Sequence, residues 1–296
     1  MTITLDRRLN AFRPDLAECA LEGLVEAKQF TAGTAARMAA PVTPLRPRPD
    51  RDAGIDTEIL MGEAVTVLDR AGGWAWVKAA ADGYVGYVPE ATISAAPLAA
   101  APLATESAPT HILAVPRSFL YTGPDLRFPN STAISMGSRF AVVGEAETRG
   151  TRYFALSDGT FVIAAHCQPV DQPVETDFVA LAARFLETPY LWGGRSGFGI
   201  DCSGLVQLCL LMTGKHAPRD TDMQYASLGE PIAREALCRG DLVFWKGHVA
   251  IMEDEDTILH ANGHTMTVAR EGFQDAVSRI GWLYDQPTGY RRLRAS

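Results

Sequence analysis

The sequence predicts an α+β domain over residues 171–296, preceded by two small all-β modules over residues 41–95 and 110–170. Short β-favouring runs separated by Gly-containing turns fill the two modules. Helical patterns followed by strand-like runs fill the third region, and that order is typical of α+β domains. A chain of 296 residues, 47% of them hydrophobic, is long enough to bury two or three separate cores.

The first 40 residues carry one weak signal. Leu16, Ala20, Leu24 and Ala27 recur at helical spacing, which predicts a short helix in an otherwise extended N-terminal segment. Prolines follow at positions 41, 44, 47 and 49. Because proline lacks an amide hydrogen and clashes inside a helix, this run predicts an extended entry into the first module.

The first module is predicted from four strand-like runs, over residues 58–60, 64–68, 74–78 and 84–88. Met61-Gly62, Ala71-Gly72-Gly73 and Asp82-Gly83 separate these runs, and such pairs signal tight turns. A linker rich in proline and alanine is expected over residues 96–109.

The second module repeats three anchors of the first. Met136-Gly137 corresponds to Met61-Gly62, the run 140–143 to the run 64–67, and Asp158-Gly159 to Asp82-Gly83. The shift is about 75 residues throughout, so two copies of one small barrel are a simpler explanation than chance recurrence of turn signals.

The third region begins with a helix that Thr176 or Asp177 caps. A second helix is expected over residues 202–212, and its nearly continuous apolar sequence requires it to be buried. Strand-like runs follow at residues 241–245, 248–253 and 257–260.

Cys202 is the candidate nucleophile of this region. It opens the predicted helix, and a helix N-terminus and a nearby histidine both lower the pKa of a thiol. His248 follows Gly247 at the start of a predicted strand, and His260 ends the next one. If these strands are neighbours, His248 is placed to act as the base and His260 to fix its tautomer. Asn262 is the alternative to His260.

This constellation resembles the NlpC/P60 family of papain-like cysteine peptidases. The resemblance implies a nucleophile at Cys202, a base at His248, an orienting residue at His260 and help from Tyr190 at the oxyanion site. It also implies cleavage of the γ-D-glutamyl to diamino acid bond in bacterial cell-wall peptides. The matching motifs, in order, are Pro189-Tyr190-x-Trp192-Gly193-Gly194, Asp201-Cys202-Ser203-Gly204-Leu205, Pro218-Arg219, Gln224, Gly240-Asp241-Leu242-Val243-Phe244, Gly247-His248-Val249-Ala250-Ile251 and His260-Ala261.

The two upstream modules look like bacterial SH3 domains, and the three-part layout resembles dipeptidyl-peptidase VI-like enzymes of murein-peptide recycling. In that group the first module limits substrate length and helps to hold a free N-terminal L-Ala. The resemblance implies contacts with this terminus from Asp201 and Ser203, and from Glu63 and Tyr84 of the first module. Asp201 has a competing role as the cap of the helix that begins at Cys202.

Composition narrows the partners and the compartment. A net charge of −8 argues against nucleic acid, and no apolar run reaches membrane-spanning length. Five scattered cysteines, with no CxxC pair and no signal-peptide pattern at the N-terminus, predict a cytoplasmic protein without a metal site or cofactor.

The expected function is therefore a cytoplasmic peptidase that acts on free murein peptides bearing an N-terminal L-Ala. Two alternatives stay open, an exported endopeptidase that acts on intact wall and a wall-binding protein whose SH3 modules carry the function. The sequence does not distinguish diaminopimelate from lysine as the diamino acid.

Overall fold

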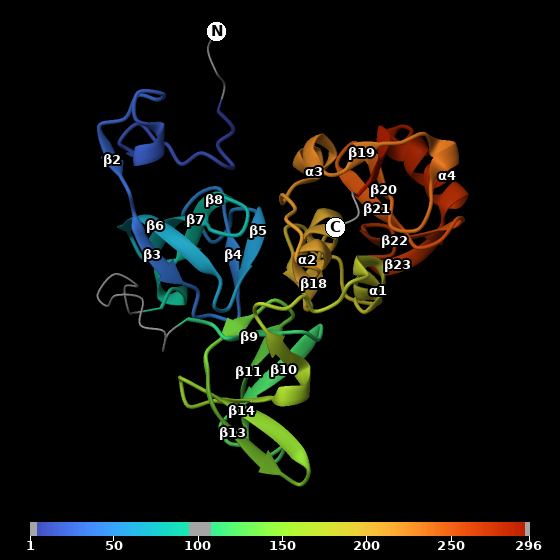
Figure 1. Cartoon of the computed structure of the whole chain (residues 1–296). Helices are drawn as coiled ribbons and strands as arrows, with labels where there is room; N and C mark the ends of the chain where they lie inside the picture. Colours follow the sequence, from blue (N-terminus) through green and yellow to red (C-terminus); the bar gives the residue numbers. More distant parts are fainter. Residues whose placement is uncertain (1–4, 95–107, 294–296) are drawn as a thin grey trace. The chain divides into compact units, whose positions relative to one another are not determined.

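The computed structural model describes residues 5–94 and 108–293, which leaves most of the linker predicted over 96–109 outside the described residues. The chain divides into two compact units, residues 1–170 and 171–296, each with hydrophobic cores of its own (Figure 1). Within the described ranges, none of the helices combines the length and the apolar character that crossing a membrane would take.

The helix predicted in the N-terminal segment is absent, and that prediction was wrong. The segment instead forms a parallel strand pair, β1 (Leu16–Glu18) and β2 (Gln29–Thr31), with a 3-10 turn at Cys19–Leu21. The helical spacing of the apolar residues gave a false prediction, because these residues do not share a buried face. They are Leu16, Ala20, Leu24 and Ala27, and Leu24 is 63% exposed.

The first module is built around a four-stranded antiparallel sheet in the order β3-β6-β7-β8. Between β3 and β6 the chain forms a separate two-stranded sheet, β4-β5. Its first strand lies before the expected start at residue 41, because Thr34–Arg37 pairs with β6. Leu45, Ile59, Val77 and Val88 form part of its core. The strands are β3 (Thr34–Arg37), β4 (Val42–Leu45), β5 (Thr57–Leu60), β6 (Ala64–Ala71), β7 (Trp74–Ala79) and β8 (Val85–Pro89), and a 3-10 turn follows at Glu90–Thr92.

The second module has a five-stranded sheet in the order β11-β10-β15-β14-β13 and a three-stranded sheet in the order β12-β9-β16. Its elements are β9 (His111–Leu113), β10 (Arg117–Tyr121), β11 (Asn130–Ser135), β12 (Arg139–Phe140), β13 (Val142–Thr148), β14 (Thr151–Leu156), β15 (Phe161–Ile163), a 3-10 turn at Ala164–His166 and β16 (Cys167–Pro169).

The internal repeat predicted from the sequence extends to individual backbone hydrogen bonds. Several recur with a shift of 75 residues: Met61 N–H to Pro41 O and Met136 N–H to Pro116 O, and Gly62 N–H to Met38 O and Gly137 N–H to Leu113 O. Both glycines have positive φ, 76° and 93°. At Gly62 a Cβ atom would also lie 2.0 Å from the Arg139 carbonyl oxygen, so only glycine fits there.

The C-terminal unit is the predicted α+β domain, with helices first and a six-stranded antiparallel sheet after them, in the order β19-β24-β20-β21-β22-β23. Its elements are α1 (Phe178–Ala183), β17 (Arg195–Ser196), β18 (Gly199–Ile200), α2 (Cys202–Met212), α3 (Thr221–Ser227), β19 (Glu230–Pro231), a 3-10 turn at Arg234–Ala236, β20 (Leu242–Trp245), β21 (His248–Met252), β22 (Thr257–Asn262), β23 (Thr267–Gly272), α4 (Phe273–Tyr284) and β24 (Gly289–Arg292).

Helix α2 is central, as its apolar sequence predicts. Every residue of α2 except Leu211 is buried, and the helix packs against β21 and β22. Asp201 caps its start and Gly214, at φ 78°, follows its end. The helix N-terminus therefore meets the sheet where β21 begins and β22 ends.

Candidate active site

Cys202 is the first residue of α2, and its side chain is almost fully buried, with 6% exposed. The backbone N–H of Val249, the residue after His248, and the Thr221 side chain both lie close enough to the Cys202 sulfur to favour its thiolate. The Val249 contact brings the start of β21 against the thiol. The sequence motifs that contain Cys202 and His248 thus meet in one place.

The pKa of the Cys202 thiol is raised, and not lowered as its place at a helix N-terminus predicts. Burial moves it from its ordinary value of 9.0 to about 11, and the adjacent Asp201 carboxylate adds to the increase. The Val249 N–H, the Arg219 guanidinium and Thr221 oppose it. At neutral pH the sulfur is therefore protonated, and a base has to remove its proton before or during attack.

The two predicted histidines are in contact. His248 Nε2 lies 2.9 Å from His260 Nδ1, and the ring centroids are 5.1 Å apart. Strands β21 and β22 are neighbours in the sheet, which is the condition that the sequence analysis set. Asn262 does not take this place, because its amide oxygen accepts the N–H groups of His264 and Thr265 in the following turn.

Burial lowers the pKa of His248 from 6.5 to about 3, and repulsion from His260 and Arg279 contributes to the decrease. The imidazole is therefore neutral at pH 7 and carries one free lone pair. Val249, the residue after His248, contacts the thiol, so this neutral imidazole is a candidate general base for the thiol proton.

Glu271 is a site residue that the sequence analysis missed. Its Oε2 atom lies 3.1 Å from Nε2 of the buried His260, an ion-pair distance, although the two atoms do not form a regular hydrogen bond. Arg279 of α4 binds the same carboxylate through two hydrogen bonds of 2.8 and 2.6 Å. Although partial burial opposes it, these bonds lower the pKa of Glu271 to about 2, so the carboxylate is ionised at neutral pH.

A strand-pairing argument could have found Glu271. His260 pairs with Ala269 across β22 and β23, and Glu271 lies two residues further along β23. Residues two apart share one face of a strand, so the pairing register places Glu271 on the face of His260. Neither β23 nor α4 was predicted from the sequence, so the pairing of His260 with Ala269 could not be anticipated.

The Glu271 carboxylate selects the tautomers of both imidazoles. A negative oxygen beside His260 Nε2 favours the hydrogen on that atom, which leaves Nδ1 as an acceptor. His260 Nδ1 then accepts the N–H of His248 Nε2. The remaining lone pair of His248 is on Nδ1, the nitrogen that stays available as a base.

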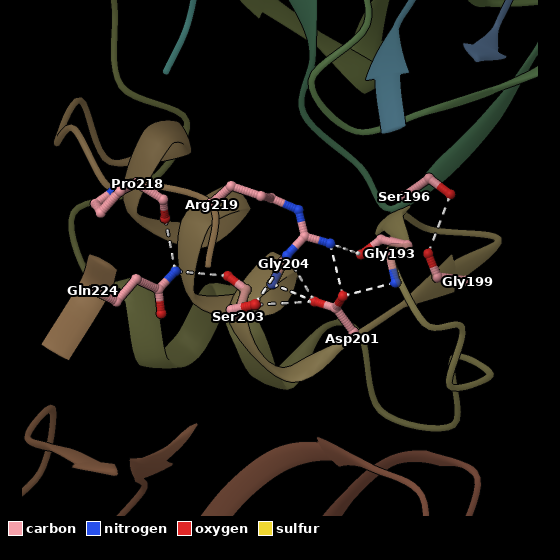
Figure 2. Close-up of polar contacts among 10 residues, drawn as sticks. Gly193, Ser196, Gly199, Asp201, Ser203, Gly204, Pro218, Arg219 and Gln224 are labelled. Carbon is pink, nitrogen blue, oxygen red and sulfur yellow. Dashed lines mark hydrogen bonds and ion pairs between the residues drawn. The ribbon is translucent and has the colours of Figure 1, made fainter. Parts of the chain in front are cut away.

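Asp201 is at the centre of a buried polar cluster (Figure 2). Its Oδ1 caps α2 by accepting the Gly204 N–H at 2.7 Å, and its Oδ2 accepts the Gly193 N–H at 2.9 Å. Arg219, 1% exposed, donates one nitrogen to each oxygen, at 3.0 and 2.7 Å. Ser203 Oγ lies 3.3 Å from Asp201 Oδ1 and accepts from Arg219 at 2.9 Å.

These contacts give Asp201 a structural role. A carboxylate has about four lone-pair positions, and protein donors fill those of Asp201. The guanidinium of Arg219 also balances its charge, and the two groups form a bidentate pair. The predicted contacts of Asp201 and Ser203 with a substrate ammonium stay predictions.

The same cluster fixes the chain on both sides of the nucleophile. Gln224 donates to the carbonyl oxygens of Ser203 and Pro218, each at 2.9 Å, and so ties the start of α2 to the loop before α3 (Figure 2). A Cβ atom on Gly204 would lie 2.4 Å from the carbonyl oxygen of Gly194. The glycines around Cys202 thus allow the 189–200 loop to pack directly on the start of α2.

Tyr190 lies close enough to Cys202 for the charge of the thiolate to help raise its pKa, although burial is the main cause. Tyr190 and His248 both line a cleft of about 450 Å³. The phenol therefore stays protonated at neutral pH and keeps its hydrogen for donation to an acceptor in the site.

Glu63 and Tyr84 belong to the N-terminal unit. The carboxylate of Glu63 accepts the N–H of Leu60 at 2.8 Å inside the first module. Tyr84 is 3% exposed and is part of the module's hydrophobic core. Their predicted contacts with substrate stay predictions. In the part of the chain that the structure describes, no three His, Cys, Asp or Glu side chains gather into a possible metal site.

Two family models match the chain. The first, described as the bacterial dipeptidyl-peptidase Sh3 domain, covers residues 45–93. The second, the NlpC/P60 family, covers residues 187–280 and so includes Tyr190, Cys202, His248, His260 and Glu271.

Curated relatives extend the similarity beyond these two matches. The γ-D-glutamyl-L-lysine dipeptidyl-peptidase of Bacillus subtilis is 30% identical over 235 residues, which are 71% of this chain and 73% of the relative. That of Bacillus cereus is 29% identical over 231 residues, 70% of this chain and 67% of the relative. The crystal structure of an NlpC/P60 protein from B. cereus shares the fold, with a TM-score of 0.71 at 22% identity, over 88% of this chain and 99% of that one.

Proposed function

Because this chain belongs to the NlpC/P60 family, we propose that it is a cysteine peptidase of murein peptides. The proposed reaction is cleavage of the γ-D-glutamyl to diamino acid bond in free peptides that begin with L-Ala. The observation that carries the proposal is the contact of His248 with His260, together with the contact between Val249, the residue after His248, and the thiol at the N-terminus of α2.

In the first half of the reaction, His248 Nδ1 takes the proton of Cys202 as the sulfur attacks the γ-carbonyl carbon of D-glutamate. The carbonyl oxygen becomes an oxyanion. The Cys202 backbone N–H, free at the helix N-terminus, and the Tyr190 hydroxyl are the donors proposed to stabilise it. His260, held by Glu271, stabilises the imidazolium that forms on His248.

In the second half, the intermediate collapses and the carbon–nitrogen bond breaks. His248 returns its proton to the leaving nitrogen, which departs as the free amine of the diamino acid. The dipeptide remains on Cys202 as a thioester. A water molecule, deprotonated by His248, then attacks the thioester carbon and releases the dipeptide acid, and the thiol is restored.

The substrate assignment is supported by the relatives. Two of them are named γ-D-glutamyl-L-lysine dipeptidyl-peptidases, and their matches cover about 70% of this chain. A dipeptidyl-peptidase removes two residues from a free N-terminus, which favours short free peptides over cross-linked wall. A recycling role in the cytoplasm, the compartment predicted from the cysteine usage, is part of this proposal.

We further propose that both modules of the N-terminal unit are SH3 domains. A family model covers only the first. The support for the second is the repeat of turn hydrogen bonds and positive-φ glycines at a constant shift of 75 residues. Ser138 occupies the position that Glu63 has in the first module. The second module therefore lacks that carboxylate, and we propose a structural role for it.

The test uses the synthetic tripeptide L-Ala-γ-D-Glu-diaminopimelate, its N-acetylated form and purified sacculi. The proposal predicts release of L-Ala-D-Glu from the free tripeptide by the wild type and loss of this release in Cys202→Ala. Activity on the acetylated form equal to that on the free form would contradict the free N-terminus. Digestion of sacculi at a comparable rate would instead favour an enzyme of the intact wall.

A further inference from the structure

The cleft that contains His248 has a defined chemical character. Aromatic and aliphatic side chains, among them Trp192, Ile280, Leu283 and Tyr284, form part of its walls. Lys246 and Arg279 supply cationic groups, and its recorded lining contains no carboxylate. The chain as a whole carries a net charge of −8, so a cationic cleft is a local exception.

The position of the cleft next to His248 indicates that it holds the leaving group of the proposed reaction. His248 lines the cleft, whereas the recorded lining within the described residues includes neither Cys202 nor Asp201. In the proposed mechanism, His248 returns its proton to the leaving nitrogen, so the departing amino acid lies beside this imidazole and away from the thioester. Tyr190, the proposed donor to the D-glutamyl oxyanion, also lines the cleft, so the cleft begins at the scissile bond, and its walls beyond His248 are the place for the diamino acid.

Lys246 is the cation of the cleft whose charge is not balanced. Glu271 neutralises Arg279 through two hydrogen bonds. Lys246 is exposed, and among residues 5–94 and 108–293 no ion pair to its ammonium is seen. A two-residue turn holds it next to the base, because Trp245 and His248 pair on either side of Lys246 and Gly247.

An unbalanced cation beside an apolar wall favours an aliphatic chain that ends in a carboxylate and disfavours one that ends in an ammonium alone. We propose that Lys246 makes the enzyme prefer diaminopimelate over lysine as the leaving residue. Both amino acids have an α-carboxylate, but only diaminopimelate has a second carboxylate at the end of its side chain. This inference rests on the proposed function and specifies its substrate.

The experiment compares kcat/KM for L-Ala-γ-D-Glu-meso-diaminopimelate and L-Ala-γ-D-Glu-L-lysine. We expect the wild type to prefer diaminopimelate by about tenfold at low ionic strength, and Lys246→Glu to remove or reverse that preference. The preference of Lys246→Gln for diaminopimelate is expected to lie between that of the wild type and that of Lys246→Glu. Lys215→Gln changes a lysine outside the cleft lining and serves as the matched control, with the preference of the wild type.

An equal rate on both peptides, unchanged in Lys246→Glu, would overturn the inference and leave the proposed function intact. Cleavage that survives Cys202→Ala, or no cleavage of either peptide, would contradict the proposed function instead. Calorimetric titration of free diaminopimelate and free lysine into Cys202→Ala, with and without Lys246→Glu, tests the inference without turnover. Weaker binding of diaminopimelate in the double variant supports it, and unchanged binding contradicts it.

Discussion

Two protons determine what the site can do, the one on the Cys202 sulfur and the one on His248. Burial raises the pKa of the thiol to about 11 and lowers that of the imidazole to about 3, so both groups are neutral at pH 7. In the proposed mechanism, proton transfer therefore accompanies attack on the substrate and does not precede it as a standing ion pair. The basicity of His248 then depends on the groups behind it, and Glu271 is the anion among them.

Glu271→Gln keeps the size of this side chain and removes its charge. Because the carboxylate raises the pKa of His248, its loss makes His248 a weaker base. We expect kcat/KM to fall by about tenfold or more, with the acid limb of its pH profile moving to lower pH. Glu271→Asp should restore part of the activity.

The matched control for that prediction is Glu253→Gln, which removes a carboxylate that pairs with the exposed Arg270. It should leave both the rate and the pH profile unchanged. An acid limb that stays in place in Glu271→Gln, even with a reduced rate, would show that Glu271 acts only on stability.

At the scale of elements, the candidate site combines residues from the ends of four elements. Cys202 begins α2, His248 begins β21, and His260 and Glu271 lie near the ends of β22 and β23. Arg219 and Asp201 fasten the 189–200 loop to the helix from inside the protein. Breaking a buried pair leaves the other charge without a partner, which costs far more than the loss of an exposed pair.

Arg219→Ala is therefore expected to lower the free energy of unfolding by about 3–5 kcal/mol, measured by urea denaturation. Arg239→Ala is the control, because Arg239 pairs with Asp177 at the surface at 2.6 Å. Its loss should cost less than about 1 kcal/mol. Similar losses in the two variants would show that the buried cluster does not stabilise the unit as described.

Gly204→Ala tests the close packing of the same loop. In an ordinary helix this change stabilises by about 1 kcal/mol. Here the new Cβ atom would lie 2.4 Å from the Gly194 carbonyl oxygen, so we expect lower stability and a loss of activity. At Gly263 a new Cβ atom would meet open space, so Gly263→Ala should preserve stability. A more stable and fully active Gly204→Ala would contradict the proposed packing.

Much of the site could be predicted because its signals are local. Each signal determines the conformation of the backbone close to it in sequence. These signals are the N-cap at Asp201, the apolar run of α2 and the glycines before Cys202. The contact between His248 and His260 needed only the assumption that two consecutive strands pair. Glu271 and Arg279 needed the register of β23 and the placement of α4, which arise from tertiary packing.

In the two β modules, too, features set by local sequence could be predicted, and features set by strand pairing could not. The turns at Gly62 and Gly137 could be matched from sequence, because a positive φ requires a specific residue. The first strand of the sheet, Thr34–Arg37, could not, because half of its residues are exposed and its pairing with β6 decides its structure. The false helix near Leu16 has the same cause, since apolar spacing alone does not say which face is buried.

At the scale of the whole molecule, buried titratable groups limit the pH range of stability. The pKa of His248 falls from 6.5 to about 3 on folding, so its contribution is complete above pH 6.5 and is lost as the pH decreases towards 3. The pKa values of Cys202 and Cys167 rise from 9.0 to about 11 and about 12. Their contributions are complete below pH 9 and are lost as the pH increases through those values.

We therefore expect the free energy of unfolding to be greatest between about pH 6.5 and pH 9, with losses of up to about 1.4 kcal/mol per pH unit for each group on either side. Urea denaturation across this range measures it. In His248→Gln, the free energy of unfolding should fall less steeply with decreasing pH below 6.5, and its decrease above pH 9 should be unchanged. An unchanged acid slope in that variant would mean that His248 is not buried as described.

The most direct test of the central claim is the release of L-Ala-D-Glu from L-Ala-γ-D-Glu-diaminopimelate, followed by chromatography with wild type, Cys202→Ala and Cys209→Ala. Cys209 is a buried thiol of the same helix and is not placed at the site. The proposed mechanism predicts release by wild type and by Cys209→Ala, and loss of release, by a factor of about 10³ or more, in Cys202→Ala. Undiminished release by Cys202→Ala would contradict it.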